Sequence, residues 1–283
     1  MPATPAHAGG VVSVCDEAHL LAALVGGGTV TFACSGTITL SDTIAIAADT
    51  TIDGSGQTVA IRSYNAVRVA TVNSGVTFAL RDLTVANGDS GLDHGGGIYN
   101  AGTVIVSNST FSGNDGYYGG GIYNRQGTVV VNNSTFSGNR GYYGGGIYNR
   151  QGTVVVSNST FFGNGFGRAG GGIANYGTVI VDSSVFRGNW GEYGGGISNL
   201  DSDASLTVRN SAFSVNTATG FGGGIRNLGT LTVSNSTFSG NEVNTGGGIF
   251  NGYGGTLTVS NCTFSGNTAS DRGGGIDNWE GTV

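Results

Sequence analysis

The polar and apolar positions of this chain follow the two-residue period of β-strands, in short runs broken by turn residues. In residues 127–149, Val129 and Val131 fall on one face of a first apolar run. Phe136 lies in a second run, and three glycines then lead into Ile147. No 3.6-residue period competes with this pattern, so it predicts strands separated by tight bends.

This unit is repeated along most of the chain. A Gly-Gly-Gly-Ile marker recurs at intervals of 24 to 28 residues, ending at Ile98, Ile122, Ile147, Ile173, Ile197, Ile225, Ile249 and Ile276. A Phe-x-x-Asn marker keeps step with it, starting at Phe111, Phe136, Phe161, Phe186, Phe213, Phe238 and Phe264. One coil cannot bury its own apolar face, but stacked coils place valine on valine and phenylalanine on phenylalanine. We therefore predict an all-β fold, a single-stranded right-handed parallel β-helix (solenoid) of roughly eleven coils, with the phenylalanines as an internal ladder.

Asparagines recur at two further positions, where a side-chain amide at a bend can bond the backbone and the coil above. One set is expected to turn inward as a ladder: Asn108, Asn133, Asn158, Asn210, Asn235 and Asn261, with Ser183 in the remaining place. A second set comprises Asn114, Asn139, Asn164, Asn189, Asn216, Asn241 and Asn267. Five members of the first set match the N-x-Ser/Thr glycosylation pattern, which an inward orientation disfavours.

Both ends of the chain depart from the repeat. Residues 1–10 fit the remnant of a removed export signal, or a disordered natural N-terminus. Residues 11–28 carry apolar residues at helical spacing and are predicted to form a short helix that caps the array. Residues 29–94 form irregular first coils, and residues 95–283 form the regular array. The sequence stops where a further strand is due, so we expect a longer protein or a partner at that end.

The three cysteines fall into two groups. Cys15 and Cys34 flank the predicted helix and can close a loop of about 20 residues, worth about 3 kcal/mol in the chain-entropy model. Two free thiols are the alternative. Cys262 stands where other repeats have serine, as at Ser236, and fits a small half-buried thiol.

Composition and charge narrow the possible partners. The chain has 283 residues with 56 glycines, 10% charged residues and a net charge of −6, and its eleven basic residues are all scattered arginines. Nucleic acid is excluded as a partner because phosphate binding needs a basic patch or stripe. No apolar run reaches the 18 residues of a transmembrane helix.

The paired markers resemble a known repeat family. Gly-Gly-Gly-Ile-Tyr-Asn, ending at Asn124, and Phe-Ser-Gly-Asn, residues 136–139, are similar to the GGAI and FxxN repeats of chlamydial polymorphic outer membrane proteins. They are equally similar to the wider group of bacterial right-handed parallel β-helix repeat proteins. The resemblance covers residues 95–283 and implies a bacterial protein that is secreted or displayed on the cell surface, with a role in adhesion. It leaves the mode of anchoring open.

Residues 51–56 and 80–88 in turn resemble the first coils of pectate-lyase-like β-helices. Enzymes of that fold cleave polysaccharides with clustered carboxylates, often with Ca²⁺. The acidic residues here do not recur in adjacent coils, so no catalytic residue is assigned; the best constellation is Asp82, Asp89, Asp93 and His94. Within it, Asp89 and Asp93 are candidates for a cation site, and a solvated turn is the alternative. No histidine triad for a metal can be assembled, and no cofactor is implied.

Tyrosines gather at two positions of the repeat. Those that follow the buried isoleucine are expected to point outward: Tyr99, Tyr123 and Tyr148, with Phe250 in the same place. Those in the loop before the glycines are Tyr117, Tyr118, Tyr142, Tyr143 and Tyr193. With Arg125, Arg150, Gln126 and Gln151 they are expected to form an aromatic ridge on one side of the rod. The alternative is that stacked tyrosines only shield neighbouring strands.

Three functions remain open from the sequence. The first is a non-catalytic structural or adhesin-like module that binds a glycan or a protein on a surface, or further copies or a missing C-terminal part of the same protein. The second is a polysaccharide lyase or hydrolase. The third is a self-assembling or ice-binding rod, suggested by threonine ranks (Thr103, Thr128, Thr153, Thr178) and by an outward apolar strip (Ile105, Val130, Val155, Ile180).

Overall fold

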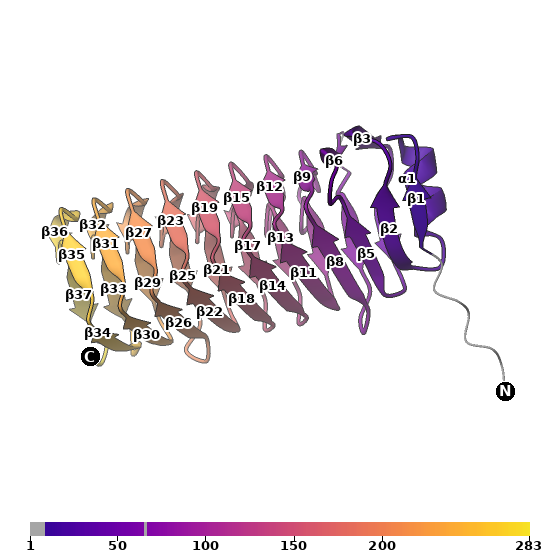
Figure 1. Ribbon diagram of the computed structural model, residues 1–283. Coiled ribbons are helices and arrows are strands. Elements are labelled where there is room, and N and C mark those ends of the chain that lie inside the picture. Colours follow the sequence, from indigo (N-terminus) through magenta and orange to yellow (C-terminus); the bar gives the residue numbers. More distant parts are fainter. Residues whose placement is uncertain (1–8, 65–66) are drawn as a thin grey trace.

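The computed structural model describes residues 9–64 and 67–283 and shows an elongated parallel β-solenoid of about 10 turns (Figure 1). The predicted fold class is confirmed, with a coil count close to the expected one. Within these residues the chain forms one helix, α1 (Glu17–Leu24), and four parallel sheets. The two ends of the rod are the two ends of the sequence (Figure 1). The export-signal remnant predicted for residues 1–10 lies almost wholly outside the described residues.

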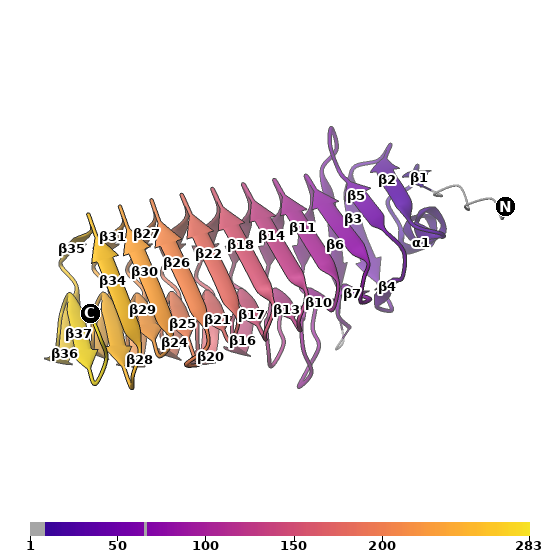
Figure 2. The ribbon, with the colours of Figure 1, turned by 90° about the horizontal axis from the view of Figure 1, so that it is seen from below.

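Each coil runs through the sheets in the order A, B, D and C, and the first coils lack a strand in sheet D. Sheet A contains β1 (Gly10–Val12), β2 (Gly28–Phe32), β5 (Thr50–Asp53), β8 (Thr77–Arg81), β11 (Thr103–Ser107), β14 (Thr128–Asn132), β18 (Thr153–Ser157), β22 (Thr178–Asp182), β26 (Ser205–Arg209), β30 (Thr230–Ser234) and β34 (Thr256–Ser260). Sheet B contains β3 (Gly36–Leu40), β6 (Val59–Ser63), β9 (Thr84–Ala86), β12 (Thr110–Ser112), β15 (Thr135–Ser137), β19 (Thr160–Phe162), β23 (Val185–Arg187), β27 (Ala212–Ser214), β31 (Thr237–Ser239) and β35 (Thr263–Ser265). Figure 2 shows the strands of sheet A side by side along the rod.

The remaining two sheets form the side of the rod that carries the tyrosines. Sheet C contains β4 (Ile44–Ile46), β7 (Ala70–Val72), β10 (Ile98–Asn100), β13 (Ile122–Asn124), β17 (Ile147–Asn149), β21 (Ile173–Asn175), β25 (Ile197–Asn199), β29 (Ile225–Asn227), β33 (Ile249–Gly252) and β37 (Ile276–Trp279). Sheet D contains β16 (Arg140–Tyr143), β20 (Gly165–Ala169), β24 (Trp190–Tyr193), β28 (Thr217–Phe221), β32 (Glu242–Thr245) and β36 (Thr268–Arg272).

The core consists of columns of like side chains. In sheet A, Val129 pairs with Val104 and Val154 in register, and all three are fully buried. In sheet B the phenylalanine rings of successive coils stack with centroids 4.7 to 4.9 Å apart and planes within 9° of parallel. This spacing equals the distance between hydrogen-bonded strands, about 4.8 Å, so the backbone register itself sets the stacking distance.

Buried asparagines form two ladders parallel to the rod. In the first, Asn139 Nδ2 donates to Asn164 Oδ1 at 2.9 Å and to the Phe111 carbonyl oxygen at 3.0 Å. In the second, Asn149 Nδ2 donates to Asn175 Oδ1 at 2.8 Å and to the Gly152 carbonyl oxygen at 2.9 Å. The ladder that contains Asn139 runs from Asn114 to Asn267 and was predicted from the Phe-x-x-Asn marker. The other ladder, which was not predicted, contains Asn100, Asn124, Asn149, Asn175, Asn199, Asn227, Asn251 and Asn278.

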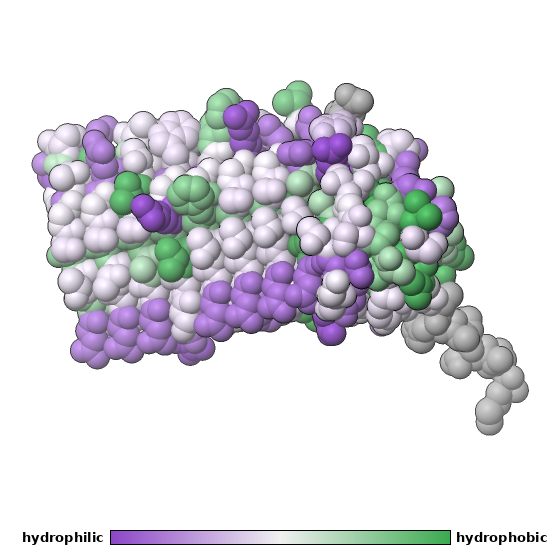
Figure 3. Space-filling model, turned by 45° about the horizontal axis from the view of Figure 1, so that its top comes forward, coloured by the Kyte–Doolittle hydropathy of each residue, from purple (hydrophilic) through white to green (hydrophobic). Residues whose placement is uncertain are grey.

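The prediction of an inward ladder for Asn108, Asn133, Asn158, Asn210, Asn235 and Asn261 is wrong. These residues are exposed, with φ between 47° and 52°, at the bend from sheet A to sheet B. Asparagine is favoured there because it tolerates left-handed backbone better than other residues with a Cβ. Figure 3 shows a hydrophilic stripe along the rod, in keeping with this exposed column.

Two different constraints explain the glycine triplets. Gly144 has φ of +66°, a conformation in which a side chain is strained. A Cβ on Gly146 would lie 2.6 Å from the Gly172 carbonyl oxygen and 2.9 Å from Phe161 Cδ1. The triplet therefore allows both the bend and the close approach of the next coil.

The N-terminal end of the rod is covered by α1 (Figure 1). The Asp16 carboxylate caps this helix by accepting from the His19 backbone nitrogen at 2.9 Å, and Leu20 is fully buried in the core. Cys15 and Cys34 are joined by a disulfide that ties the start of α1 to the first coil. No helix in the described part of the chain is long and apolar enough to cross a membrane.

Outside the core, sheet A is a flat face. Its outward apolar residues, Ile105, Val130, Val155 and Ile180, are half-buried and lie in one register column that continues as Thr207, Thr232 and Thr258. The polar excursion at residues 200–204 projects as an exposed turn, but Leu200 packs on the tyrosines and Ala204 is buried.

We predict that Asn164→Ala lowers the free energy of unfolding by about 3 kcal/mol or more, because it removes the buried oxygen that accepts from both Asn139 nitrogens and the amide that donates to Phe136 and Asn189. Asn158→Gly is the matched control, since glycine keeps the left-handed bend, and should change stability by less than about 0.5 kcal/mol. Urea denaturation measures both. Equal losses in the two variants would mean that the buried amides do not act as a ladder.

A second prediction concerns the disulfide. Replacing both Cys15 and Cys34 by serine should lower the free energy of unfolding by about 3 kcal/mol, because the loop between them is no longer closed in the unfolded chain. Cys262→Ser is the control, because it restores the serine of the other coils and should be close to neutral. A double variant as stable as the native chain in the same titration would contradict this assignment.

Candidate functional site

One register column on the outer face of sheet C contains four aromatic residues, Tyr99, Tyr123, Tyr148 and Phe250. Its members follow the buried isoleucine in each coil: Tyr99, Tyr123, Tyr148, Ala174, Ser198, Arg226, Phe250 and Asp277. The backbone pairing of sheet C places these side chains directly above one another. The column is therefore aromatic at first, small in the middle and polar or aromatic afterwards.

The prediction that these residues point away from the core is correct, but the expectation of an exposed ridge is wrong for three of them. Tyr123 is 1% exposed, Tyr148 6% and Phe250 0%. Other rings cover them: Tyr118 lies edge-on to Tyr148 at 4.9 Å, and Phe221 lies 4.5 Å from Phe250. The cover comes from the loop before the glycines and from sheet D, whose position the repeat pattern did not reveal.

The tyrosines form three stacked ranks, which we call the tyrosine cluster. The inner rank continues from Tyr99 through Tyr123 to Tyr148, and the last two rings are 5.4 Å apart and 3° from parallel. In the middle rank Tyr118 stacks on Tyr143 at 5.4 Å. The outer rank is Tyr117 on Tyr142 at 5.0 Å. Tyr193 stands apart, stacked on Phe221 at 5.9 Å.

Arginines surround the tyrosine cluster and bond its hydroxyls. Arg125 Nη1 donates to Tyr99 Oη at 3.2 Å, and Arg168 Nη1 donates to Tyr143 Oη at 3.1 Å. Burial raises the pKa of Tyr148 far above that of a free phenol, with smaller contributions from Tyr176 and Tyr123. The Tyr148 hydroxyl therefore stays protonated and neutral at physiological pH, able to donate as well as to accept hydrogen bonds.

A pocket of about 400 Å³, which we call the tyrosine pocket, opens beside the inner rank of the tyrosine cluster. It is lined by the buried Tyr123 and Tyr148 and by the half-buried Tyr118 and Tyr176. Its other lining residues are His94, Arg150, Gln151 and Asp201. The pocket combines flat aromatic faces with one cation, one carboxylate, one amide and one imidazole, a composition that fits a hydroxyl-rich small ligand.

Four of the ligand-binding residues predicted from the sequence line this pocket, namely Tyr118, Tyr123, Tyr148 and Arg150. The others do not: Tyr99, Tyr117, Tyr142, Tyr143, Tyr193 and Arg125. Tyr176 was missed, although it follows the ladder residue Asn175 as Arg150 follows Asn149 and could have been found by aligning the coils. Asp201 lies in an exposed turn that occurs in only one coil, and the fold of this turn brings it to the pocket.

The candidate cation residues Asp89 and Asp93 are not held together. Asp93 bonds His94 Nδ1 at 2.6 Å and forms an ion pair with Arg68. Asp89 instead pairs along the rod with Asp115, whose pKa is raised first by desolvation and then by the Asp89 charge. No group of three or more histidine, cysteine or acidic side chains suited to a metal occurs in residues 9–64 and 67–283.

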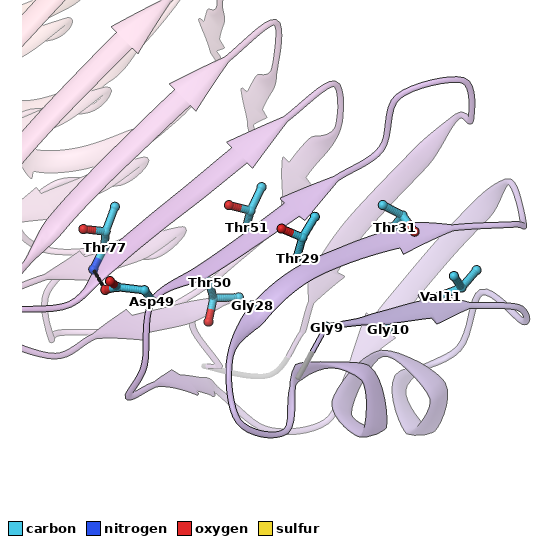
Figure 4. Close-up of a pocket in the computed structure, with 10 residues that line it drawn as sticks. All are labelled: Gly9, Gly10, Val11, Gly28, Thr29, Thr31, Asp49, Thr50, Thr51 and Thr77. Carbon is cyan, nitrogen blue, oxygen red and sulfur yellow. Dashed lines mark hydrogen bonds between the residues drawn. The ribbon is translucent and has the colours of Figure 1, made fainter. Parts of the chain in front are cut away.

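A second, larger hollow of about 820 Å³ lies near the N-terminal end, on the outer face of sheet A. Figure 4 shows its threonines, among them Thr29, Thr51 and Thr77, standing on neighbouring strands of the same face. The one ionisable group lining it, Asp49, already accepts from the Thr77 backbone nitrogen at 2.8 Å. This hollow has no aromatic residue and no arginine in the described part of its lining, whereas the tyrosine pocket has both. We therefore regard the tyrosine pocket as the candidate site.

Comparison with known proteins agrees with the repeat. The family model of the Chlamydia polymorphic membrane protein repeat matches residues 133–150 and 261–278. No curated protein sequence matches the chain significantly. The two matched segments each contain one Phe-x-x-Asn marker and the following Gly-Gly-Gly-Ile, so the chain carries repeats similar to those of this membrane protein family.

Proposed function

We propose that this chain is a non-catalytic, adhesin-like module of a secreted or cell-surface bacterial protein, and that it binds a glycan in the tyrosine pocket. The similarity of two segments to the polymorphic membrane protein repeat suggests a cell-surface protein of the autotransporter type. The disulfide between Cys15 and Cys34 supports export, because disulfides persist in oxidising compartments.

The observation that carries the glycan proposal is the geometry of the pocket. Sugar rings present apolar faces edged by hydroxyls, and they pack on aromatic faces while the hydroxyls bond planar polar groups. Here two half-buried tyrosines, Tyr118 and Tyr176, are accompanied by Arg150, Gln151 and Asp201.

Rigidity of the supporting coils favours such a role. Tyr123 and Tyr148 are held by backbone pairing on both sides and by stacked neighbours, so the base of the pocket is already formed before a ligand binds. The same stacking would serve a shielding role alone, but shielding does not require a pocket with a mixed set of polar groups at its surface.

A hydrolase is the second candidate, supported by the Asp89 and Asp115 pair. Desolvation and the neighbouring Asp89 raise the pKa of the Asp115 carboxyl, and glycoside cleavage uses a carboxylic acid of raised pKa together with a second carboxylate. This pair lies in the loop before the glycines rather than in the tyrosine pocket. Product formation from glycans that is lost in Asp115→Asn would favour the enzyme over the adhesin.

We predict that Tyr118→Ala weakens glycan binding at least about tenfold, because it removes one aromatic wall of the pocket. A glycan array identifies the ligand, and calorimetric titration measures the affinity of the native chain and of the variant. Phe166→Ala is the matched control, since Phe166 is 72% exposed and does not line this pocket. Equal losses in both variants, or binding unaffected by Tyr118→Ala, would rule out the pocket as the glycan site.

A further inference from the structure

Three polar side chains in the sheet C column, those of Ser198, Arg226 and Asp277, have a buried atom without a hydrogen-bond partner among the described residues, and the first two are adjacent. Ser198 and Arg226 are register partners on β25 and β29, and they do not bond each other. Ser198 is fully buried, and its Oγ has no hydrogen-bond partner within the described residues. The Nε of Arg226 is likewise buried and unpartnered among those residues. Buried polar atoms are nearly always satisfied, so this pair requires a physical reason.

Arg226 also has no nearby counter-charge. Its guanidinium lies 4.5 Å from the centre of the Tyr193 ring. The groups that act on it are Tyr193, Tyr253, Tyr176 and Arg168, and none of them is a carboxylate. Desolvation lowers its pKa, which means that the surroundings oppose its charge rather than support it. No ion pair of the described chain includes Arg226 or Arg168.

Arg168 provides a second cation at the same place. It is exposed, is held by Tyr143, and acts electrostatically on Tyr176, Tyr193 and Arg226. Glu192 contributes to the raised pKa of Arg168, but less than Tyr143 and Tyr142 do. Two like charges near each other, one of them largely removed from water, are stabilised when an anion binds between them.

We propose that Arg168 and Arg226 bind a carboxylate of an acidic sugar, so that the glycan bound in the tyrosine pocket is a uronate-containing oligosaccharide. This inference rests on the proposed function. Tyr176 lines the pocket, and both arginines lie at Tyr193: the Arg226 guanidinium packs on its ring, and Arg168 precedes Ala169, the register partner of Tyr193. The planar guanidinium fork matches a carboxylate in two parallel hydrogen bonds.

A sugar is favoured over an acidic peptide because aromatic rings are present at both places: Tyr176 packs on Tyr148 at the pocket, and the Tyr193 ring packs against Arg226. Three pairing steps of about 4.8 Å separate Tyr148 from Arg226 along the column, a length that several linked sugar rings span. The chain as a whole carries a net charge of −6, so attraction of an acidic ligand must come from these local cations rather than from the overall field.

The test uses tetrasaccharides of galacturonate, of mannuronate and guluronate, and of hyaluronan, each compared with its carboxyl methyl ester. Calorimetric titration of the native chain at low salt should show at least one acid bound about tenfold or more tightly than its ester, and added salt should reduce this difference. Arg226→Gln and Arg168→Gln should each bring the acid to the affinity of the ester while leaving ester binding unchanged.

Arg187→Gln is the matched control, because Arg187 is exposed on sheet B, and it should leave the preference intact. Arg168→Gln removes only an exposed side chain, so it tests the proposal even if Arg226→Gln fails to fold. Equal binding of every acid and its ester, or a preference that survives both arginine variants, would overturn the inference while leaving glycan binding in place. If the chain binds none of the acids or esters and no neutral glycan, the proposed function fails as well.

Discussion

The structure depends on one constraint: each residue of a coil lies directly above its equivalent in the coil below. Parallel backbone pairing imposes this register, and it spaces like side chains at the distance between strands. For phenylalanine that distance is a stacking contact, and for asparagine it is a hydrogen bond from one amide to the next. A column is stable only if nearly every member is compatible with its neighbours, which explains the close repetition of the sequence.

The same register extends to residues outside the core, and the candidate site is its product. Tyr99, Tyr123 and Tyr148 stack because Ile98, Ile122 and Ile147 beneath them pair in register. Where the column changes to Ala174 and Ser198, the aromatic rank ends. The pocket therefore arises where the external columns stop repeating while the internal ones continue.

Much of the fold could be predicted from the sequence because the internal columns show their period directly. The columns of phenylalanine and valine could be predicted by assuming only that identical residues of successive coils stack on one another. The error over Asn108 has a physical cause: a repeated asparagine is favoured both by a buried amide ladder and by an exposed left-handed bend, and the sequence alone does not separate the two. The covering of Tyr148 was missed because it depends on sheet D, whose strands have register shifts and little alternation. Asp201 and Arg226 belong to single coils, so no repetition pointed to them.

The most direct test of the central claim is an NMR titration of the chain, labelled at its tyrosine rings, with a tightly bound oligosaccharide. The account predicts that the resonances of Tyr118, Tyr148 and Tyr176, which line the pocket, shift in proportion to occupancy. The resonance of Tyr64, which is exposed and does not line the pocket, should stay unchanged. Saturation of binding with no shift in the pocket tyrosines would contradict the account.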